Sequence, residues 1–394
     1  MRILANLWRL SLVHWYPGDR TGRYQIHELL RQLADAQLEA VPGEREAVEA
    51  RHGTFYLALA EAAAEYTGMR QVEWLDRIER DHDNTRAAQE RFAECGEVEM
   101  ELRLVTAAMY FWFIHGYHTE GTERLLHTLA RPEAGAPTAV RTRALNGASY
   151  LQWVRGHLRE AHALFTESVE IARTIKAEAI LAFGLCYLGA VVNAWGEYAA
   201  AEVLLEESLT IWPPLGSDND MGLSLMFLGD SALGRSEMDR ARASLTQSAD
   251  LFRGTGNVKV LPYPLRRLGH LALLEHDGGH AAILYNKSMT LNLDVGDRQG
   301  VAASLVGMAA VAEGRKDPEQ AARFLGAADA LVETIQTQLL PFDHEESERI
   351  TTAVRAQLDA ATFPTSWAGG RAMTCEQAVG AASEWAASTI GCAS

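Results

Sequence analysis

The chain of 394 residues has few of the features that mark membrane or secreted proteins. Its four cysteines are scattered, without a CxxC pair or framework spacing, which favours reduced thiols in a cytoplasmic protein. No apolar run approaches the roughly 18–20 residues that a membrane helix needs, so we expect no membrane partner. The opening MRILANLWRLSLVHWYPG lacks a small-residue cleavage site and is not expected to be a signal peptide.

Positive charge is also scarce. The 36 Lys and Arg residues are outnumbered by 52 Asp and Glu residues, which gives a formal net charge of −16. Nucleic-acid surfaces need clustered Lys and Arg to bind phosphates, so we expect no direct nucleic-acid binding by this chain. An acidic surface favours neutral or basic partners instead.

Motifs that carry chemistry are missing as well. The sequence contains no GxxxxGK[ST] phosphate loop, no GxSxG nucleophile elbow and no HExxH zinc motif. The histidines of HDGGH (residues 276–280) lack a third defined ligand, and Asp and Gly favour a turn there. The dense charges of ERDHDNTR (residues 79–86) are typical of a solvated or salt-bridged helix face. We therefore predict a non-enzymatic protein without cofactor, metal or catalytic residues.

What the chain does contain is a period of 40 residues. Small residues recur at this spacing at Gly121, Ala161, Ala201, Ala241, Ala281 and Ala321. Two further columns with the same period hold Ser168, Ser208, Ser248 and Ser288, and Gly189, Gly229 and Gly269. A fixed period between 20 and 50 residues indicates a solenoid of supersecondary units.

Each period predicts one pair of helices. The first helices are expected at Met100–His115, Val140–Arg155, Ile180–Trp195, Met221–Arg235, Leu261–His276 and Gly300–Glu313. The second helices are expected to begin near Thr119, Arg159, Ala199, Asp239, Gly279 and Glu319. The turns between them carry Gly116, Gly156, Gly196, Gly278 and Gly314, which tolerate the positive φ of a helix end.

The flanks depart from this period. Leu12–His27 predicts a β-hairpin around the turn PGDRTG, followed by a helix that stops at Pro42-Gly43. Helices are expected at Arg45–Tyr66 and Val72–Cys95, and after Ile335 a loop, one helix, a glycine-rich turn at SWAGG and a last helix. The predicted regions are 1–42 (hairpin and helix), 43–97 (helical lead-in), 98–335 (six helix pairs) and 336–394 (cap).

The helix pairs resemble the tetratricopeptide repeat. Both the small residue one turn into each second helix and the Leu-Gly pairs of the first helices (Leu188-Gly189, Leu228-Gly229, Leu268-Gly269) fit this repeat. The period of 40 is longer than its usual ~34. Longer repeats of this kind resemble the C-terminal array of bacterial STAND-type regulatory ATPases, the large LuxR-type and SARP-type transcription regulators.

Three further stretches carry the narrower resemblance. The end of the winged-helix segment of that family resembles RYQIHELLRQLADAQLE in this chain. The helix before its repeats resembles WLDRIERDHDNTRAAQERF, and its C-terminal cap resembles AARFLGAADAL. The resemblance implies an all-α, right-handed tetratricopeptide-like solenoid with a winged-helix-like β-hairpin remnant. It also implies the sensor region of such a regulator, without its ATPase core or a complete DNA-binding domain. Whether the chain is a fragment or a free-standing protein stays open.

The resemblance also implies that the first helices line a concave groove. We take as inward the positions three before, one after and four after the Ser149/Gly189/Gly229/Gly269 column. These positions give the predicted binding residues Tyr110, Phe113, Asn146, Tyr150, Trp153, Cys186, Asn193, Met226, Asp230, Arg266 and His270. Apolar walls with few polar anchors suit a peptide, a protein segment or a small effector. One alternative is a subunit that docks in trans on a separate ATPase or DNA-binding regulator through its N-terminal segment; another is an enzyme of unrecognised type.

Overall fold

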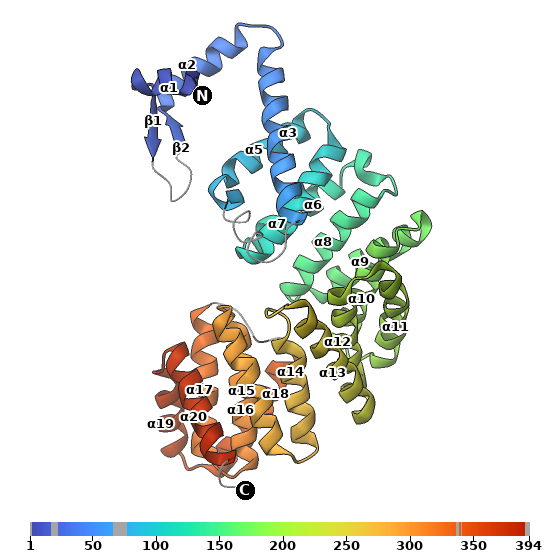
Figure 1. Ribbon diagram of the computed structural model, residues 1–394, viewed down its shortest axis with the longest axis vertical. Helices are drawn as coiled ribbons and strands as arrows, with labels where there is room; N and C mark the ends of the chain where they lie inside the picture. Colours follow the sequence, from blue (N-terminus) through green and yellow to red (C-terminus); the bar gives the residue numbers. More distant parts are fainter. Residues whose placement is uncertain (1, 17–22, 66–76, 336–338, 340, 391–394) are drawn as a thin grey trace. The chain divides into compact units, whose positions relative to one another are not determined.

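The computed structural model describes residues 2–16, 23–65, 77–335, 339 and 341–390. The chain divides into an N-terminal unit, Met1–Ala136, and a C-terminal unit, Pro137–Ser394, each with its own internal contacts (Figure 1). Among the described residues no helix is long and apolar enough to cross a membrane.

The N-terminal unit begins with the predicted hairpin. Strand β1 (Val13–Tyr16) pairs antiparallel with β2 (Arg23–Ile26), with Val13 opposite Ile26, and α2 (Glu28–Glu39) follows. His27 begins this helix because its Nδ1 accepts a hydrogen bond from the amide of Leu29 at 3.3 Å. The predicted turn at residues 17–22 lies outside the described residues. Helix α1 (Arg2–Arg9), which the sequence pattern did not predict, precedes β1.

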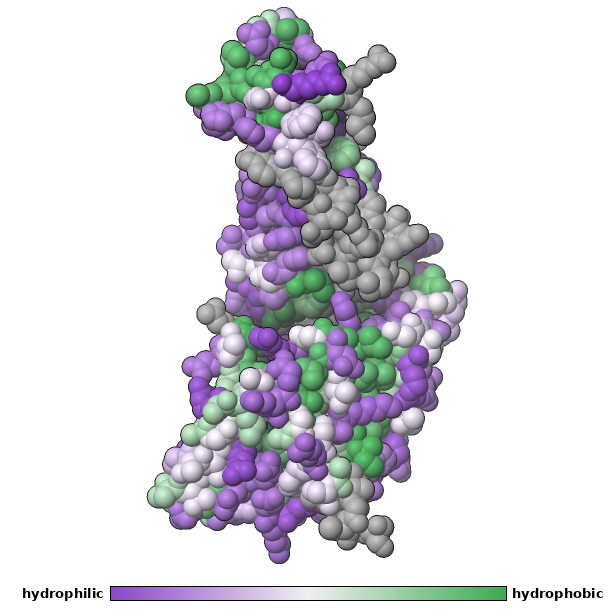
Figure 2. All heavy atoms as spheres, turned by 60° about the vertical axis from the view of Figure 1, so that its left-hand side comes forward, coloured by the Kyte–Doolittle hydropathy of each residue, from purple (hydrophilic) through white to green (hydrophobic). Residues whose placement is uncertain are grey.

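This N-terminal segment exposes many large apolar side chains. They come from α1, both strands, α2 and the connections around them: Ile3, Leu4, Trp8, Leu10, Trp15, Tyr24, Ile26, Leu29, Leu33 and Val41. Figure 2 shows apolar residues gathered in its upper part, at the height of this segment in Figure 1. Contiguous exposed apolar surface of this kind marks an interaction site in many proteins.

The rest of the unit is helical: α3 (Glu44–Glu65), α5 (His82–Glu94), α6 (Val98–Ile114), α7 (His118–Leu129) and the 3₁₀ turn η1 (Pro132–Gly135). The helix predicted at Val72–Cys95 is interrupted at Asp81, whose side chain accepts a hydrogen bond from the Asn84 amide at 3.3 Å. Aspartate favours helix starts because its carboxylate competes with the backbone for local donors. Residues 72–76 of that prediction lie outside the described residues.

The C-terminal unit is the predicted tetratricopeptide-like array of helix pairs. Its first helices are α8 (Ala139–Val154), α10 (Glu178–Ala194), α12 (Asp218–Gly234), α14 (Pro262–Leu274) and α16 (Arg298–Gly314). Its second helices are α9 (Leu158–Ile175), α11 (Tyr198–Leu215), α13 (Met238–Thr255), α15 (Gly278–Asp294) and α17 (Pro318–Thr334). Every start lies within three residues of its prediction, as does that of α6 in the N-terminal unit.

The periodic residues make the same contacts in successive pairs. The alanine column from Ala161 to Ala321 is fully buried, which lets the helices approach closely. Each serine of the second column donates a hydrogen bond to a backbone carbonyl of its own first helix: Ser168 to Thr142, Ser208 to Ala182, Ser248 to Gly222 and Ser288 to Pro262, at 2.7–3.2 Å. A Cβ on Gly189 would lie 2.7 Å from Leu205 Cγ, so this column is small for packing reasons.

The turns inside the pairs also repeat every 40 residues. Gly116, Gly156 and Gly196 adopt φ values of 77–78°, as predicted, and in the later turns Ser236, His276 and Lys316 adopt φ values of 60–64°. The prediction was wrong for Gly278 and Gly314, which belong to helices α15 and α16. The later turns therefore place side-chain-bearing residues in a backbone region that favours glycine.

Three helices close the array: α18 (Pro341–Gln357), α19 (Thr362–Arg371) and α20 (Cys375–Ile390). The glycine-rich turn predicted at SWAGG is wrong, because these residues lie within α19. A Cβ on Gly370 would collide with the backbone carbonyl of Arg323 in α17, and one on Gly326 of α17 would collide with the carbonyl of Trp367 in α19. These glycines allow α17 and α19 to pack closely. Glycines that serve packing and glycines that form a turn look alike in the sequence.

Candidate functional site

The first helices of the C-terminal unit form one continuous layer. α8 contacts α10, α10 contacts α12, α12 contacts α14, and α14 contacts α16, whereas the second helices pack mainly on the first helices. In a curved array the row whose members touch one another lies on the inside. We call the surface of α8, α10, α12 and α14 that faces away from the second helices the inner face.

The first part of the inner face carries an aromatic cluster from three helices. Tyr150 and Trp153 of α8 are half-buried and contact Tyr187 of α10, with ring centroids 5.1 and 5.6 Å apart and edge-on geometry. Trp153 also reaches Phe227 of α12 at 6.2 Å. Tyr187 and Phe227 are buried and form the floor of the cluster. Edge-on contact is a preferred geometry for aromatic pairs and favours this orientation of the exposed rings.

The next part of the inner face is charged. Arg267 of α14 donates a hydrogen bond from Nε to Asp230 of α12 at 2.8 Å. Asp343, in the first turn of α18, accepts from Arg266 Nε and Nη2 at 3.2 and 3.0 Å and from Arg267 Nη1 at 3.1 Å. Arg266 and Asp343 are only 3% and 4% exposed. We call Asp230, Arg266, Arg267, His270, Phe342 and Asp343 the arginine clamp.

Aromatic contacts complete the arginine clamp. The Arg267 guanidinium lies 3.9 Å from the centroid of the Phe342 ring, and the His270 ring meets the same ring edge-on at 4.9 Å. Glu346, one turn further along α18, lies 3.8 Å from His270 Nδ1. Helix α18, orange in Figure 1, thus covers the inner face at α14 with its first turns.

The pKa shifts follow from burial opposed by these charges. Burial alone would raise the pKa of the Asp343 carboxyl, but Arg266 and Arg267 outweigh burial and hold its pKa below the ordinary range. Burial lowers the pKa of His270 against the opposing effect of Glu346, so the imidazole is neutral at pH 7. Asp343 is therefore a carboxylate that the two guanidinium groups stabilise.

Four predicted binding residues are not accessible on the inner face. Asn146, Cys186, Met226 and Arg266 are all buried, so the prediction of an exposed position is wrong for them. Burial raises the pKa of the Cys186 thiol to about 12, which leaves a protonated, unreactive group. Arg266 is buried because α18 covers it.

Two predicted asparagines act as links between successive pairs. Asn146 accepts from Ser168 Oγ at 2.6 Å and donates to the Ile180 carbonyl of the next first helix at 3.3 Å. Asn193 donates to the Phe227 carbonyl of α12 and accepts from Ser231, both at 2.8 Å. Their amides are engaged in these inter-helix bonds, which the spacing of inward positions could not reveal.

The remaining predicted residues are half-buried. Tyr150 and Trp153 belong to the aromatic cluster, and Asp230 and His270 to the arginine clamp. Tyr110 and Phe113 lie in the N-terminal unit, where their rings are 6.1 Å apart and burial raises the pKa of Tyr110. The sequence pattern missed Tyr187, Phe227 and Arg267, which lie two residues before the Gly column, and every contributor from α18.

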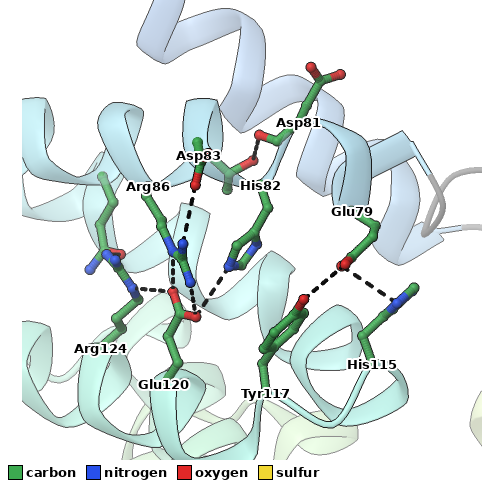
Figure 3. Close-up of polar contacts among 11 residues, drawn as sticks. Glu79, Asp81, His82, Asp83, Arg86, His115, Tyr117, Glu120 and Arg124 are labelled. Atoms are coloured by element: carbon green, nitrogen blue, oxygen red, sulfur yellow. Dashed lines mark hydrogen bonds and ion pairs between the residues drawn. The ribbon is translucent and has the colours of Figure 1, made fainter.

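The N-terminal unit holds a second polar cluster, at the segment ERDHDNTR. Glu120 of α7 accepts from Arg86 at 2.5 and 2.7 Å, from His82 at 3.2 Å and from Arg124 at 2.8 Å (Figure 3). Burial would raise the pKa of Glu120, but the hydrogen bonds from Arg86 and His82 lower it to about 2. The interpretation as a salt-bridged helix face is confirmed for these residues.

A cleft of about 470 Å³ adjoins this cluster between α5, α6 and α7. Most of its polar lining is already engaged: Glu120 as above, Glu101 with Arg131 at 2.9 Å and with Thr128 at 2.7 Å, and Arg124 with Gln89 at 2.6 Å. Among the described residues no group of three His, Cys, Asp or Glu side chains could hold a metal ion. These side chains of the cleft are therefore satisfied within the protein.

Comparisons with known proteins identify solved structures with a similar fold but no family to which the chain belongs. No protein-family model matches the chain, and no curated protein does. A solved Rap protein complexed with competence and sporulation factor has a TM-score of 0.56 at 10% identity, over 84% of this chain and 94% of that one.

Two further solved structures are similar at lower scores. A STAND protein with a tetratricopeptide repeat sensor from Pyrococcus horikoshii has a TM-score of 0.48 at 13% identity, over 97% of this chain and 60% of that one. A putative kinesin light chain with tetratricopeptide-like repeats from Podosopora anserina has a TM-score of 0.39 at 16% identity, over 49% and 96%. At these identities the likeness concerns the fold alone, which is that of a tetratricopeptide-like helical-repeat protein.

Proposed function

We propose that the chain is a binding module that captures a peptide or protein segment on its inner face, as the sensor part of a transcriptional or signalling regulator of the STAND type. The observation that carries this proposal is the aromatic cluster. Tyr150 and Trp153 are half-exposed and contact buried aromatic rings edge-on. Aromatic anchors of this kind supply most of the binding energy in many interfaces, and their fixed orientation lowers the entropy cost of binding.

The solved Rap protein lends support from the same fold. That protein is complexed with a factor, so an array with this architecture can hold a ligand. A non-enzymatic role agrees with the missing catalytic motifs in the sequence. A small effector is the second kind of ligand that the half-exposed rings could hold.

The test compares the wild-type chain with Tyr150→Ala/Trp153→Ala in a pull-down, followed by titration of the partner that is found. We expect at least a tenfold loss of affinity, because hot-spot aromatics contribute about 2 kcal/mol or more. Val203→Ala is the control, since Val203 is 65% exposed but lies on α11, a second helix that does not belong to the inner face. Equal affinity of the folded double variant would remove the aromatic cluster as the binding site.

A second candidate function is docking in trans through the N-terminal segment. The exposed apolar side chains that the structure describes between Ile3 and Val41 favour it. Deletion of residues 1–42 should abolish capture of a separate ATPase or DNA-binding regulator while circular dichroism shows intact repeats. If the shortened chain retains the same partner, this function fails.

A further inference from the structure

The first turn of α18 presents one chemical pattern to the inner face, a ring followed directly by a carboxylate. The Phe342 ring contacts the Arg267 guanidinium, 3.9 Å from its centroid, and the His270 ring, which it meets edge-on at 4.9 Å. Asp343 accepts three hydrogen bonds, two from Arg266 and one from Arg267. The ring is thus held by Arg267 and His270, and the carboxylate by Arg266 and Arg267.

The charges of the arginine clamp are balanced only when Asp343 is present. Arg266 and Arg267 carry two positive charges, and Asp230 on α12 supplies one negative charge. Without Asp343 the site would hold one unmatched buried cation, which strongly favours an incoming carboxylate. Arg266 Nη1 is buried and has no hydrogen-bond partner even with Asp343 in place. The clamp therefore has donor capacity that its present occupant does not use.

The first turn of α18 is held differently from the rest of the helix. Ile350 and Val354 are buried in the core that α18 shares with α16 and α17. Phe342 is only half-buried, and the described contacts of the first turn with α14 are ion pairs and ring contacts. The two halves of α18 are therefore held by different kinds of contact, apolar packing in one and polar and ring contacts in the other.

We propose that the arginine clamp is a binding site for a peptide segment with an aromatic residue followed directly by an aspartate or glutamate, and that Phe342-Asp343 is its internal occupant. A partner segment of this chemistry binds by taking the place of the first turn of α18. The inference rests on the proposed function, because it names the ligand chemistry of one part of the same inner face.

The experiment uses a fluorescein-labelled peptide of residues 342–351, FDHEESERIT. Its host is the full chain with the occupant removed, Phe342→Ala/Asp343→Ser, and anisotropy reports binding. We expect the host to bind at least tenfold tighter than the wild type, whose clamp is filled. A peptide with the change Asp343→Asn should bind the host at least tenfold more weakly, because hydrogen bonds to a charged acceptor are the stronger ones.

Three results would overturn the proposal: no binding by the folded host, equal binding by the wild type, or equal binding of the asparagine peptide. If the host does not fold, amide exchange of the wild type replaces it. Excess peptide should then speed exchange in the first turn of α18 and leave the turn around Ile350 and Val354 unchanged, and an unaltered first turn overturns the proposal. If the peptide fails while Tyr150→Ala/Trp153→Ala still loses its partner, the proposed function stands and this inference alone falls.

Discussion

Helices α8 and α14 are equivalent first helices of the repeat, and their side chains on the inner face differ in what covers them. At α8 the inward positions carry Tyr150 and Trp153, which stay half-exposed on an aromatic floor. At α14 His270 is the equivalent of Tyr150, and Arg266 is the equivalent of Asn146, 120 residues earlier in each case; both lie under the first turns of α18. An inward position in a repeat therefore specifies a direction for the side chain, and the segment that packs on it decides its exposure.

The largest expected effect concerns the glycines that hold the cap in place. Gly369 and Gly370 are neighbours in α19, yet only a Cβ at Gly370 would collide with α17, while one at Gly369 meets nothing within 4 Å. We expect Gly370→Ala to destabilise the C-terminal unit by roughly 3 kcal/mol through steric strain. Gly369→Ala should stabilise it by about 1 kcal/mol, since alanine favours helix.

Urea unfolding of the two glycine variants measures this difference. Because α17 also packs on α18, Gly370→Ala should loosen the covered part of the inner face as well, which faster amide exchange in α18 would report. Equal stability of the two variants would mean that α17 and α19 are not packed as closely as described.

The next effect separates a structural asparagine from a binding residue. Asn193 makes two hydrogen bonds of 2.8 Å to α12, so Asn193→Ala should cost about 2 kcal/mol in the free energy of unfolding. The exposed Gln247 of α13 is the control, and Gln247→Ala should change stability by less than about 0.5 kcal/mol. The affinity of folded Asn193→Ala for the partner should equal that of the wild type. A large loss of affinity would mean that Asn193 contacts the partner.

These corrections show how far the sequence reaches. The helix boundaries were predictable because packing repeats every 40 residues, and the alanine column from Ala161 to Ala321 keeps that phase. The links made by Asn146 and Asn193 join side chains to carbonyls of the following pair, which periodicity does not encode. Likewise, nothing in PFDHEESER indicates that Asp343 meets arginines 76 and 77 residues earlier, because that contact depends on the path of the whole cap.

Acid should act on the more exposed charge cluster of the N-terminal unit. The pKa of Glu120 is lowered to about 2 from an ordinary value of 4.5, so its contribution is fully present above pH 4.5. As the pH falls from 4.5 towards 2, the Glu120 carboxyl is protonated in the unfolded state but stays ionised in the folded state. The free energy of unfolding therefore decreases. Glu120→Gln should reduce the slope of stability against pH in this window, as urea titrations at successive pH values would show. An unchanged slope would indicate that the ion pairs with Arg86 and Arg124 are weaker than their geometry implies.

The smallest expected effect compares early and late turns of the repeat. Lys316 adopts φ 61°, a backbone region that costs a residue with a side chain about 1 kcal/mol, whereas Gly156 adopts φ 78° at the equivalent place without that cost. Lys316→Gly should therefore raise the free energy of unfolding by roughly 0.5 kcal/mol after the entropy loss of glycine is subtracted. Lys316→Ala keeps the strain and should be neutral, and Gly156→Ala should lose about 1 kcal/mol. If Lys316→Gly and Lys316→Ala unfold at the same urea concentration, the positive φ of Lys316 costs the protein no stability.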